Sequence, residues 1–386
     1  MLSYWEQTTL PTYGVIVVGS GLIGLSTAVE ISLRRPGWKI LLLERGLLPT
    51  GATTRNAGFA CFGSLTEILA DVRRLGREAA LAQVERRFRG LHLLRQRLGD
   101  EPIGYEHHGG YELLLDGQME ALHELPSMNT WLRPIFKTEV FQVMKERGTQ
   151  SAAAAMGFNA RTVRAIVKNP FEGQLHSGRL MRTLLAMARE KGIEILTGAS
   201  VASVDTVGDR AEVRVRHGVL PVEVPFRAAQ VVVCANGLTG ELLPDSGITP
   251  ARGQVLVTAP LPDLPWRGCF HMDEGFVYFR NINSPEGQRV LLGGARNVAP
   301  SAEDTGDLAI TQTIQGRLEQ LLRDTLMPGK APAIEHRWAG TMGFSADRLP
   351  IVKRVSGRVS VAFGCNGMGV ALGSLIAQEA AALVVE

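Results

Sequence analysis

Three closely spaced glycines near the start of the chain have the spacing of a phosphate-binding turn. They follow the apolar run 14–18 and precede a segment of helical character, 25–33, and the turn reads Gly19, Ser20, Gly21, Leu22, Ile23 and Gly24. Glycine at these positions permits a tight turn, a close backbone approach to a pyrophosphate and close packing of helix on strand. The helix N-terminus adds unpaired N–H groups and a positive dipole end. This spacing predicts dinucleotide binding.

A carboxylate stands at the matching distance beyond the glycines. The apolar run 39–43 ends in Glu44 and Arg45, and Glu44 lies 20 residues after Gly24. In a βαβ unit such an acid accepts hydrogen bonds from the adenosine ribose. Because strand, glycines, helix, strand and acid follow in one run, we expect a Rossmann-like α/β unit. We find no second copy, which argues against a plan in which NAD(P)H reduces a bound FAD.

Small polar residues with glycine at both ends, 49–58, follow the second expected strand. This segment contains Thr53, Thr54, Arg55, Asn56, Ala57 and Gly58. It resembles the second FAD-binding loop of the D-amino-acid oxidase superfamily, which includes glycine oxidase, sarcosine oxidase and D-amino-acid dehydrogenase. The resemblance implies that this run wraps the diphosphate and the flavin edge.

Further segments resemble the same superfamily in the same order. They are 174–178 before a helix 179–191, a strand 193–196 leading to Val201, a strand 230–234 ending in Ala235, Asn236 and Gly237, the run 293–296, the segment 338–341 with Gly340 before 347–352, and a closing turn with Gly364, Asn366, Gly367, Met368, Gly369, Val370 and Ala371. The resemblance implies that these segments hold FAD and that the backbone of Val201 contacts the adenine. The last helix is then expected to direct its positive end at the flavin ring, stabilising negative charge near N1.

The resemblance implies an α/β protein with two interleaved domains. A Rossmann-like FAD-binding domain takes 1–95, 155–245 and 336–386, and an α+β substrate domain with an antiparallel sheet takes 96–154 and 246–335. Residue patterns add detail. The segment 66–98 predicts one or two amphipathic helices, 276–280 and 289–292 predict neighbouring antiparallel strands, and the alternation over 204–224 predicts a meander.

Several positions that carry substrate-binding or flavin-linking groups in the superfamily hold other residues here. The arginine that binds a substrate carboxylate aligns with Met342, and the basic residues of the sarcosine-oxidase pattern align with Gly58 and Ala371. The oxygen-activating lysine aligns with Leu291 and the flavin-linking cysteine with Gly340. We therefore expect non-covalent FAD, and a substrate that either lacks an α-carboxylate or is bound by another cation.

Candidates for lining the substrate cavity, besides Met342, are Arg280, Arg296, Tyr278 and His271. Each also has a structural interpretation. Arg280 fits a surface arginine at a strand end and Arg296 an ion pair within its domain. Tyr278 fits core packing, and His271 fits a turn. None of them is identified as an acid or a base, and catalysis is expected to rest on orientation and on the helix dipole.

Composition excludes several other classes of protein. The chain has 386 residues, and its net charge of +3 comes from mixed charges, which argues against a nucleic-acid partner. No apolar run reaches the ~18 residues that cross a bilayer. The four cysteines are scattered without metal-ligand spacing, so we expect neither a metal nor structural disulfides. The expected location is the cytoplasm, free or peripheral to the inner membrane face.

These observations favour an FAD-dependent oxidoreductase that dehydrogenates the C–N bond of a small amine or amino acid. A hydride is expected to pass to flavin N5 and give an imine, with O2 or a quinone as the electron acceptor. Two alternatives stay open. One is oxidation of a 2-hydroxy acid or polyol phosphate. The other is a flavin-binding subunit whose activity needs a partner chain.

Overall fold

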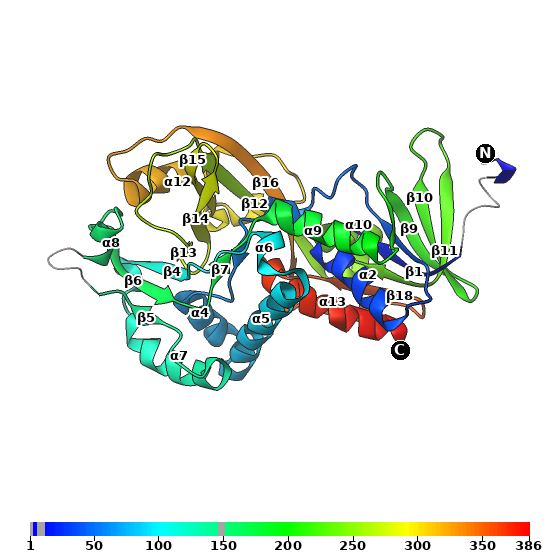
Figure 1. Ribbon diagram of the computed structural model, residues 1–386, viewed down its shortest axis with the longest axis horizontal. Coiled ribbons are helices and arrows are strands. Elements are labelled where there is room, and N and C mark those ends of the chain that lie inside the picture. The colour runs from blue at the N-terminus through cyan, green and yellow to red at the C-terminus, as the bar shows by residue number, and fades with distance from the viewer. Residues whose placement is uncertain (1–2, 6–11, 146–150) are drawn as a thin grey trace.

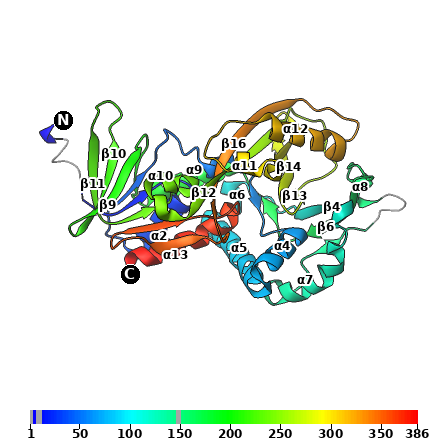
Figure 2. The same cartoon turned by 180° about the vertical axis from the view of Figure 1, so that it is seen from behind.

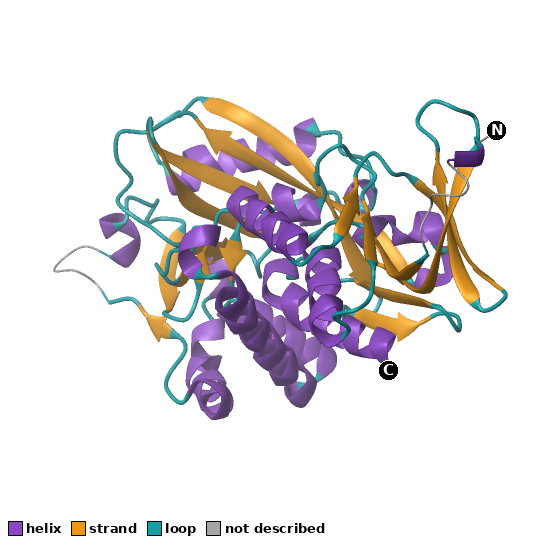
Figure 3. Cartoon of the chain, turned by 45° about the vertical axis from the view of Figure 1, so that its right-hand side comes forward, coloured by secondary structure: helices purple, strands orange, loops and turns teal. Residues whose placement is uncertain are grey.

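Two large β-sheets lie toward opposite ends of the computed structural model, which describes residues 3–5, 12–145 and 151–386 (Figure 1). The longer helices lie between and below the strands in the view of Figure 3. A two-stranded sheet, β3 (Phe59–Ala60) with β7 (Gly173–Gln174), is separate from both. Among the described residues no helix has the length and apolar character needed to cross a bilayer.

The first sheet contains the expected βαβ unit. Its parallel strands run in the order β18 (Val359–Phe363), β11 (Glu223–Val233), β1 (Tyr13–Val18), β2 (Ile40–Leu43) and β8 (Glu194–Leu196). An antiparallel strand, β17 (Ile351–Arg354), pairs with β18 at one edge. The expected meander consists of β9 (Val201–Val207), β10 (Arg210–Arg216) and the first part of β11.

Alternate residues of β1 face two different cores, as expected for a strand buried on both sides. Val15 and Val17 pack with the apolar side chains of α2 (Leu22–Arg34), α9 (Ser177–Glu190) and α13 (Gly369–Val385). Ile16 and Val18 pack on the meander. Figure 2 shows α2 and α13 side by side next to the first sheet.

The second sheet contains eight strands and is antiparallel except where β13 pairs with β4. Its order is β16 (Ile334–Ser345), β12 (Ile248–Thr258), β15 (Gly287–Gly294), β14 (Val277–Ser284), β13 (Cys269–Met272), β4 (Gly110–Leu115), β6 (Val163–Asn169) and β5 (Gln142–Val143). One face is covered by α12 (Gln312–Leu321), whose Ile314 and Leu318 pack against Phe279 and Leu292. The other face carries the candidate site.

Helices α4 (Leu65–Leu75) and α5 (Arg77–Leu98) account for the amphipathic segment 66–98. Helix α5 crosses α13 closely, because a Cβ at Gly90 would lie 2.0 Å from the carbonyl oxygen of Ala371. Helix α7 (Ala121–Phe136) packs in a cluster with α4 and α5. The shorter helices are α3 (Ala52–Arg55), α6 (Asp100–Ile103), α8 (Ala152–Ala155), α10 (Thr239–Leu242) and α11 (Pro300–Glu303).

The expected architecture, a Rossmann-like sheet with a second antiparallel one, is confirmed. Strand pairing refines the division along the sequence. Strand β6 lies within the range 155–245, and β16 overlaps the range 336–386; both ranges are expected for FAD binding. Both strands nevertheless belong to the second sheet, because β6 pairs with β4 and β16 pairs with β12. Residues 1–2, 6–11 and 146–150 of the expected ranges lie outside the described residues. The domain boundaries themselves stay predictions.

Candidate active site

The turn after β1 has the close backbone packing that its glycines predict. Gly19 has a φ of 101°, and a Cβ there would lie 2.7 Å from the Cys234 carbonyl oxygen. A Cβ at Gly24 would lie 1.8 Å from the Gly19 carbonyl oxygen. Gly21 is the N-cap of α2 and supplies no capping side chain, and the first turn of the helix contains no acidic residue. This helix end suits an anion.

Glu44 lies beside this turn, at the end of β2. One carboxylate oxygen accepts hydrogen bonds from the Ser20 amide, at 3.2 Å, and the Ser20 hydroxyl. The amide of Ala199 donates to the Glu44 carbonyl at 2.8 Å, which brings the segment before Val201 beside the acid. This arrangement fits the expected adenosine end of a dinucleotide. Arg45 instead forms an exposed ion pair with Glu241.

The expected FAD loop is held by side chains that bind backbone groups. Thr53 Oγ1 accepts a hydrogen bond from the Leu22 amide at 2.9 Å and so joins the loop to the start of α2. Asn56 Oδ1 accepts from the Gly58 amide at 2.7 Å and from the Ser177 hydroxyl at 2.8 Å, which joins the loop to α9. The Thr54 hydroxyl donates to the Pro49 carbonyl at 3.2 Å within the loop.

Arg55 connects the loop to β16. Its guanidinium donates to the carbonyls of Thr50, at 2.8 Å, and Ala339, at 2.7 Å. Trp338 Nε1 donates in return to the Arg55 carbonyl at 2.9 Å, and a Cβ at Gly340 would lie 2.9 Å from Arg55 Cβ. In this structure Arg55 therefore positions the loop, and its expected contact with FAD stays a prediction.

Two further turns reach the same part of β16. In the turn that contains Ala235, Asn236 Nδ2 donates to the Thr341 carbonyl at 3.4 Å, and a Cβ at Gly237 would lie 2.5 Å from the Met342 carbonyl oxygen. In the closing turn, Asn366 Oδ1 accepts from the Ser345 amide at 2.9 Å. Gly364, Asn366 and Gly367 all have positive φ. Helix α13 begins directly afterwards, with Met368 as its N-cap and Gly369, Val370 and Ala371 as its first residues.

Strand register brings most of the candidate side chains to one face of the second sheet. Tyr278 pairs with His271 on one side and Gly293 on the other, Arg280 pairs with Leu291, and Gly253 pairs with Gly340. Because side chains on paired residues point the same way, these positions share a face. Met342 lies two residues beyond Gly340 on that face. The residues on it are Glu112, Cys269, His271, Tyr278, Arg280, Leu291, Gly253, Val255, Trp338, Gly340 and Met342.

Partly exposed aromatic and apolar side chains gather at this face. Tyr278, Trp338 and Met342 belong to the sheet, Ala57 and Phe59 pack against it from the expected FAD loop and β3, and we call these five residues the aromatic wall. Ala57, Tyr278 and Trp338 form one apolar cluster with buried Leu291. Phe59 packs edge-on against Tyr278, with ring centroids 5.8 Å apart. Burial raises the pKa of the Tyr278 hydroxyl to about 12, so this group is neutral near pH 7.

Arg280 is buried in the middle of β14, so its interpretation as a surface arginine at a strand end is wrong. Its Nη1 donates to the carbonyls of Gly58, at 3.0 Å, and Leu175, at 2.8 Å. A Cβ at Gly58 would lie 2.8 Å from the same nitrogen, so the guanidinium fills the space beside the end of the FAD loop. Burial lowers the pKa of Arg280.

His271 is also buried, in β13, so its interpretation as a turn residue is wrong. Its Nε2 lies 3.4 Å from a carboxylate oxygen of Glu172, and its ring packs edge-on against Phe59. Burial alone lowers the pKa of His271, but Glu172 and, more weakly, Glu67 and Glu112 raise it overall. The charged imidazolium is therefore favoured just behind the aromatic wall.

Glu172 itself gave no sequence signal, because it lies in the turn before β7, far from His271 in the chain. It accepts hydrogen bonds from the Phe62 and Gly63 amides at 3.0 and 3.2 Å. Cys61 lies beside this pair, and ligand-type atoms of Cys61, Glu172 and His271 are all within 4.8 Å of one another. The sequence predicts no metal here because these three residues are widely separated. Burial raises the pKa of the Cys61 thiol well above its usual value.

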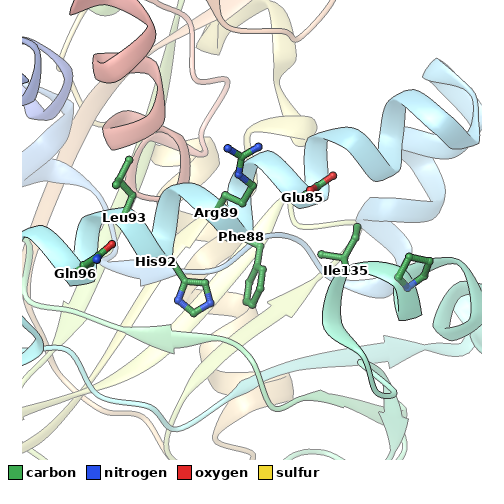
Figure 4. Close-up of a pocket in the computed structure, with 8 residues that line it drawn as sticks. Glu85, Phe88, Arg89, His92, Leu93, Gln96 and Ile135 are labelled. Carbon is green, nitrogen blue, oxygen red and sulfur yellow. The ribbon is translucent and has the colours of Figure 1, made fainter.

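Arg296 does not join the aromatic wall. It forms the expected ion pair within its domain, with Asp304 at 2.6 Å, and its guanidinium lies over the Phe344 ring. A hollow of about 340 Å³ lies between α5 and α7, and its lining includes Phe88, Arg89 and His92 (Figure 4). None of the aromatic-wall residues lines it. All four cysteines of the sequence lie in described segments, buried and without disulfides.

The residues present fit FAD. The backbone of the glycine turn is packed so closely that Gly24 has no room for a side chain. Glu44 lies beside the turn, where the ribose of the dinucleotide is expected. The loop at Thr53–Gly58, the turn at Asn236 and the start of α13 then converge on Gly340 and Met342. These segments would hold the dinucleotide along α2 and the flavin against the aromatic wall.

Comparison with known proteins agrees with this geometry. The curated glycine oxidase of Pseudomonas aeruginosa is 31% identical over 252 residues, which are 63% of this chain and 62% of that enzyme, less than two thirds of its length. The gamma-glutamylputrescine oxidoreductase of Escherichia coli is 23% identical over 377 residues, 93% of this chain and 80% of that protein. In fold, the chain is similar to glycine oxidase from Geobacillus kaustophilus, with a TM-score of 0.75, 20% identity and coverage of 97% of this chain and 95% of that one. A family model described as FAD dependent oxidoreductase matches residues 14–383, and the chain therefore belongs to this DAO family of FAD-dependent oxidoreductases.

Proposed function

We propose that this oxidoreductase dehydrogenates the C–N bond of a small amine or amino acid. The observation that carries the proposal is the convergence of the FAD loop, the closing turn and the aromatic wall at Gly340 and Met342. A substrate held against this wall lies beside the segments expected to hold the flavin. The matched relatives are named for glycine and gamma-glutamylputrescine, both nitrogen compounds, which supports a C–N bond over a C–O bond.

When bound, FAD supplies the hydride acceptor, and the imine left on the substrate hydrolyses to a carbonyl compound and an amine. The chain's own residues orient and desolvate the substrate. Phe59, Tyr278 and Met342 exclude water from the reacting carbon. The N-terminus of α13, without an acidic residue in its first turn, stabilises negative charge that develops beside it. No side chain has to act as a base if the substrate amine arrives neutral.

Oxidation of a 2-hydroxy acid or a polyol phosphate is the less favoured alternative. Both substrates carry an anionic group that needs a cation when it is buried, as an amino acid does but a simple amine does not. Arg280 and Arg55, which lie beside the aromatic wall, already donate to backbone carbonyls. Leu291, at the position of the oxygen-activating lysine, is an apolar side chain in the cluster behind Tyr278. O2 and a quinone both stay open as the electron acceptor.

The test is anaerobic mixing of the purified flavoprotein with separate classes of substrate while the flavin absorbance is followed. We expect bleaching by amines or amino acids and none by lactate or glycerol phosphate. Bleaching only by the hydroxy compounds overturns the proposal. If dithionite bleaches the flavin and every substrate fails until a co-purifying chain is added, the protein is a subunit that needs a partner. Admitting air after reduction separates O2 from other acceptors.

A further inference from the structure

Arg280 and Arg55, the two arginines beside the aromatic wall, both bind backbone carbonyls. Arg280 Nη1 donates to the carbonyls of Gly58 and Leu175, and its Nε is buried without a hydrogen-bond partner. Arg55 donates to the carbonyls of Thr50 and Ala339. Moving the Arg280 guanidinium toward a substrate would leave the Leu175 carbonyl without a donor, and moving Arg55 would break its hydrogen bonds to Thr50 and Ala339.

The other arginines of the neighbouring strands point elsewhere. Arg252 pairs with Thr341 in the β12–β16 ladder, so it lies on the face opposite to Gly253 and Gly340. Its side chain is buried against Glu303, with nitrogen–oxygen distances of 3.0 and 2.8 Å. Arg296 is paired with Asp304. His271 lies behind Phe59 and beside Glu172. Arg280, Arg55, Arg252, Arg296 and His271 are therefore each in contact with protein groups other than a substrate.

The Met342 side chain lies close to Gly253 of β12 and to Gly367 of the closing turn. A Cβ built on Gly253 would lie 3.1 Å from the Met342 methyl carbon and 3.8 Å from the Tyr278 hydroxyl oxygen. A Cβ built on Gly367, in the closing turn, would lie 3.9 Å from the Met342 sulfur. The thioether thus stands between the sheet face and the start of α13. It makes dispersion contacts and offers no charge.

This environment favours an alkylamine over an α-amino acid. A carboxylate placed against Phe59, Tyr278 and Met342 would lose its hydration without gaining a cation, which is unfavourable. An amine can adapt to these surroundings, because it can lose its proton or interact as a cation with the aromatic faces. The apolar side chains bind the carbon substituents instead.

We propose that the substrate is an amine whose reacting carbon carries no carboxylate, and that Met342 sets this preference. The inference rests on the proposed C–N dehydrogenation and names its substrate class. In the site described above, the aromatic wall binds the alkyl group next to the reacting carbon, and the Met342 thioether fills the place where a carboxylate-binding cation could stand.

The first experiment compares pairs that differ only by the carboxylate on the reacting carbon. The purified holoenzyme is mixed anaerobically with sarcosine or dimethylamine, proline or pyrrolidine, and phenylalanine or 2-phenylethylamine, and the rate of flavin bleaching is measured. We expect the amine of at least one pair to react at least about tenfold faster than its acid. If the acids react faster, the inference is wrong while C–N dehydrogenation stands. If none of these six compounds bleaches the flavin while lactate or glycerol phosphate, mixed in the same way, does, the proposed function itself is wrong.

The second experiment changes Met342 and reads equilibrium binding as well as rate. In Met342→Arg a guanidinium enters the wall, so we expect the ratio of acid to amine reactivity to rise by roughly tenfold to hundredfold. Benzoate should perturb the oxidised flavin spectrum of this variant at a concentration at least about tenfold lower than in the unchanged protein. Met342→Leu keeps an apolar side chain of similar size, and we expect it to leave both ratios within about threefold. Equal benzoate affinity in Met342→Arg and Met342→Leu, with both flavoproteins folded and yellow, overturns the role of Met342.

Discussion

At the residue scale, Arg280 shows how a buried charge can serve the backbone. Its guanidinium satisfies the carbonyls of Gly58 and Leu175, one from the FAD loop and one from the segment that leads into α9. Hydrogen bonds from charged donors are stronger than neutral ones, and a buried carbonyl without a donor is costly. Arg280 therefore links three segments that are distant in sequence.

We predict that Arg280→Met weakens both the fold and FAD binding. Loss of the donor leaves the Leu175 carbonyl unpaired, while the Gly58 carbonyl keeps the Leu175 amide as a donor, so the free energy of unfolding should fall by ~1–3 kcal/mol. FAD should dissociate more readily because the end of its loop is released. Urea unfolding and the flavin retained after desalting measure the two effects.

Arg164→Met is the matched control, since Arg164 lies in the same sheet and forms an exposed ion pair with Asp116 at 3.2 Å. Such a pair contributes ~0–1 kcal/mol. Equal destabilisation by the two variants would contradict the role assigned to Arg280.

The pair of His271 and Glu172 predicts a pH-dependent part of the stability. Although burial opposes it, the neighbouring carboxylates raise the pKa of His271 in the folded protein above its value of ~6.5 in an unfolded chain. A raised histidine pKa gives stability that is fully present below ~6.5 and is lost as the pH rises through the folded value. The carboxyl pKa values of Glu67 and Glu112 are themselves raised by burial.

We test this with the double variant His271→Gln and Glu172→Gln, which removes both charges together and leaves neither one buried alone. Free energies of unfolding are measured in urea at pH 6, 7.5 and 9. The difference between the unchanged protein and the double variant should be largest at pH 6 and should shrink toward pH 9. A difference that stays constant or grows with pH would show that His271 is not the titrating group.

At the element scale, the β1–turn–α2 unit places a helix N-terminus against a strand with no room for side chains. We predict that Gly24→Ala separates α2 from the turn, because the new Cβ would stand 1.8 Å from the Gly19 carbonyl oxygen. FAD affinity should fall at least about tenfold, as measured by flavin fluorescence quenching. Gly37→Ala is the control, since a Cβ at Gly37 meets nothing within 4 Å. Equal FAD affinity in the two variants would refute the prediction.

Elements with local signals were predictable from the sequence. The glycine spacing and Glu44 predict β1, α2 and β2, and the structure has all three. The alternation at Val213 and Val215 predicts the meander. The hairpin of β14 and β15 was also expected, although its turn is shorter than 281–287, because pairing continues to Ser284 and Gly287.

Features that depend on distant partners were not predictable in the same way. His271 has a local sequence typical of a turn, but Glu172 and the pairing of β13 with β4 make it a buried strand residue. From the sequence alone, Arg280 fits the end of a strand, because the sequence does not show that Gly58 and Leu175 lie beside it. Strand β6 belongs to the second sheet because β4 pairs with it, and single-sequence patterns carry no information on that pairing.

At the scale of the whole molecule, the expected FAD site draws on segments from almost the full length of the chain. Residues near 20, 55, 236, 341 and 366 meet through hydrogen bonds and close contacts. A ligand that binds such a site stabilises the native state of all these segments together.

We predict that FAD at about 100 times its dissociation constant raises the melting temperature by about 3 °C. The stabilisation of ~2.7 kcal/mol is divided by the unfolding entropy that is usual for a protein of 386 residues. Circular dichroism and tryptophan fluorescence should shift together, since Trp38 packs in the first half and Trp266 in the second. A shift seen by one method alone would contradict a shared site.

The contact between α13 and α2 has a consequence for how the protein is made. Helix α2 is synthesised early, but one side of it packs against α13, and a Cβ at Gly373 would lie 2.7 Å from the Leu22 side chain. Until α13 has been translated, the apolar side of α2 has no such cover. The nascent chain must therefore keep that surface from aggregating until residues 369–385 emerge, and cofactor loading waits until α13 packs against α2.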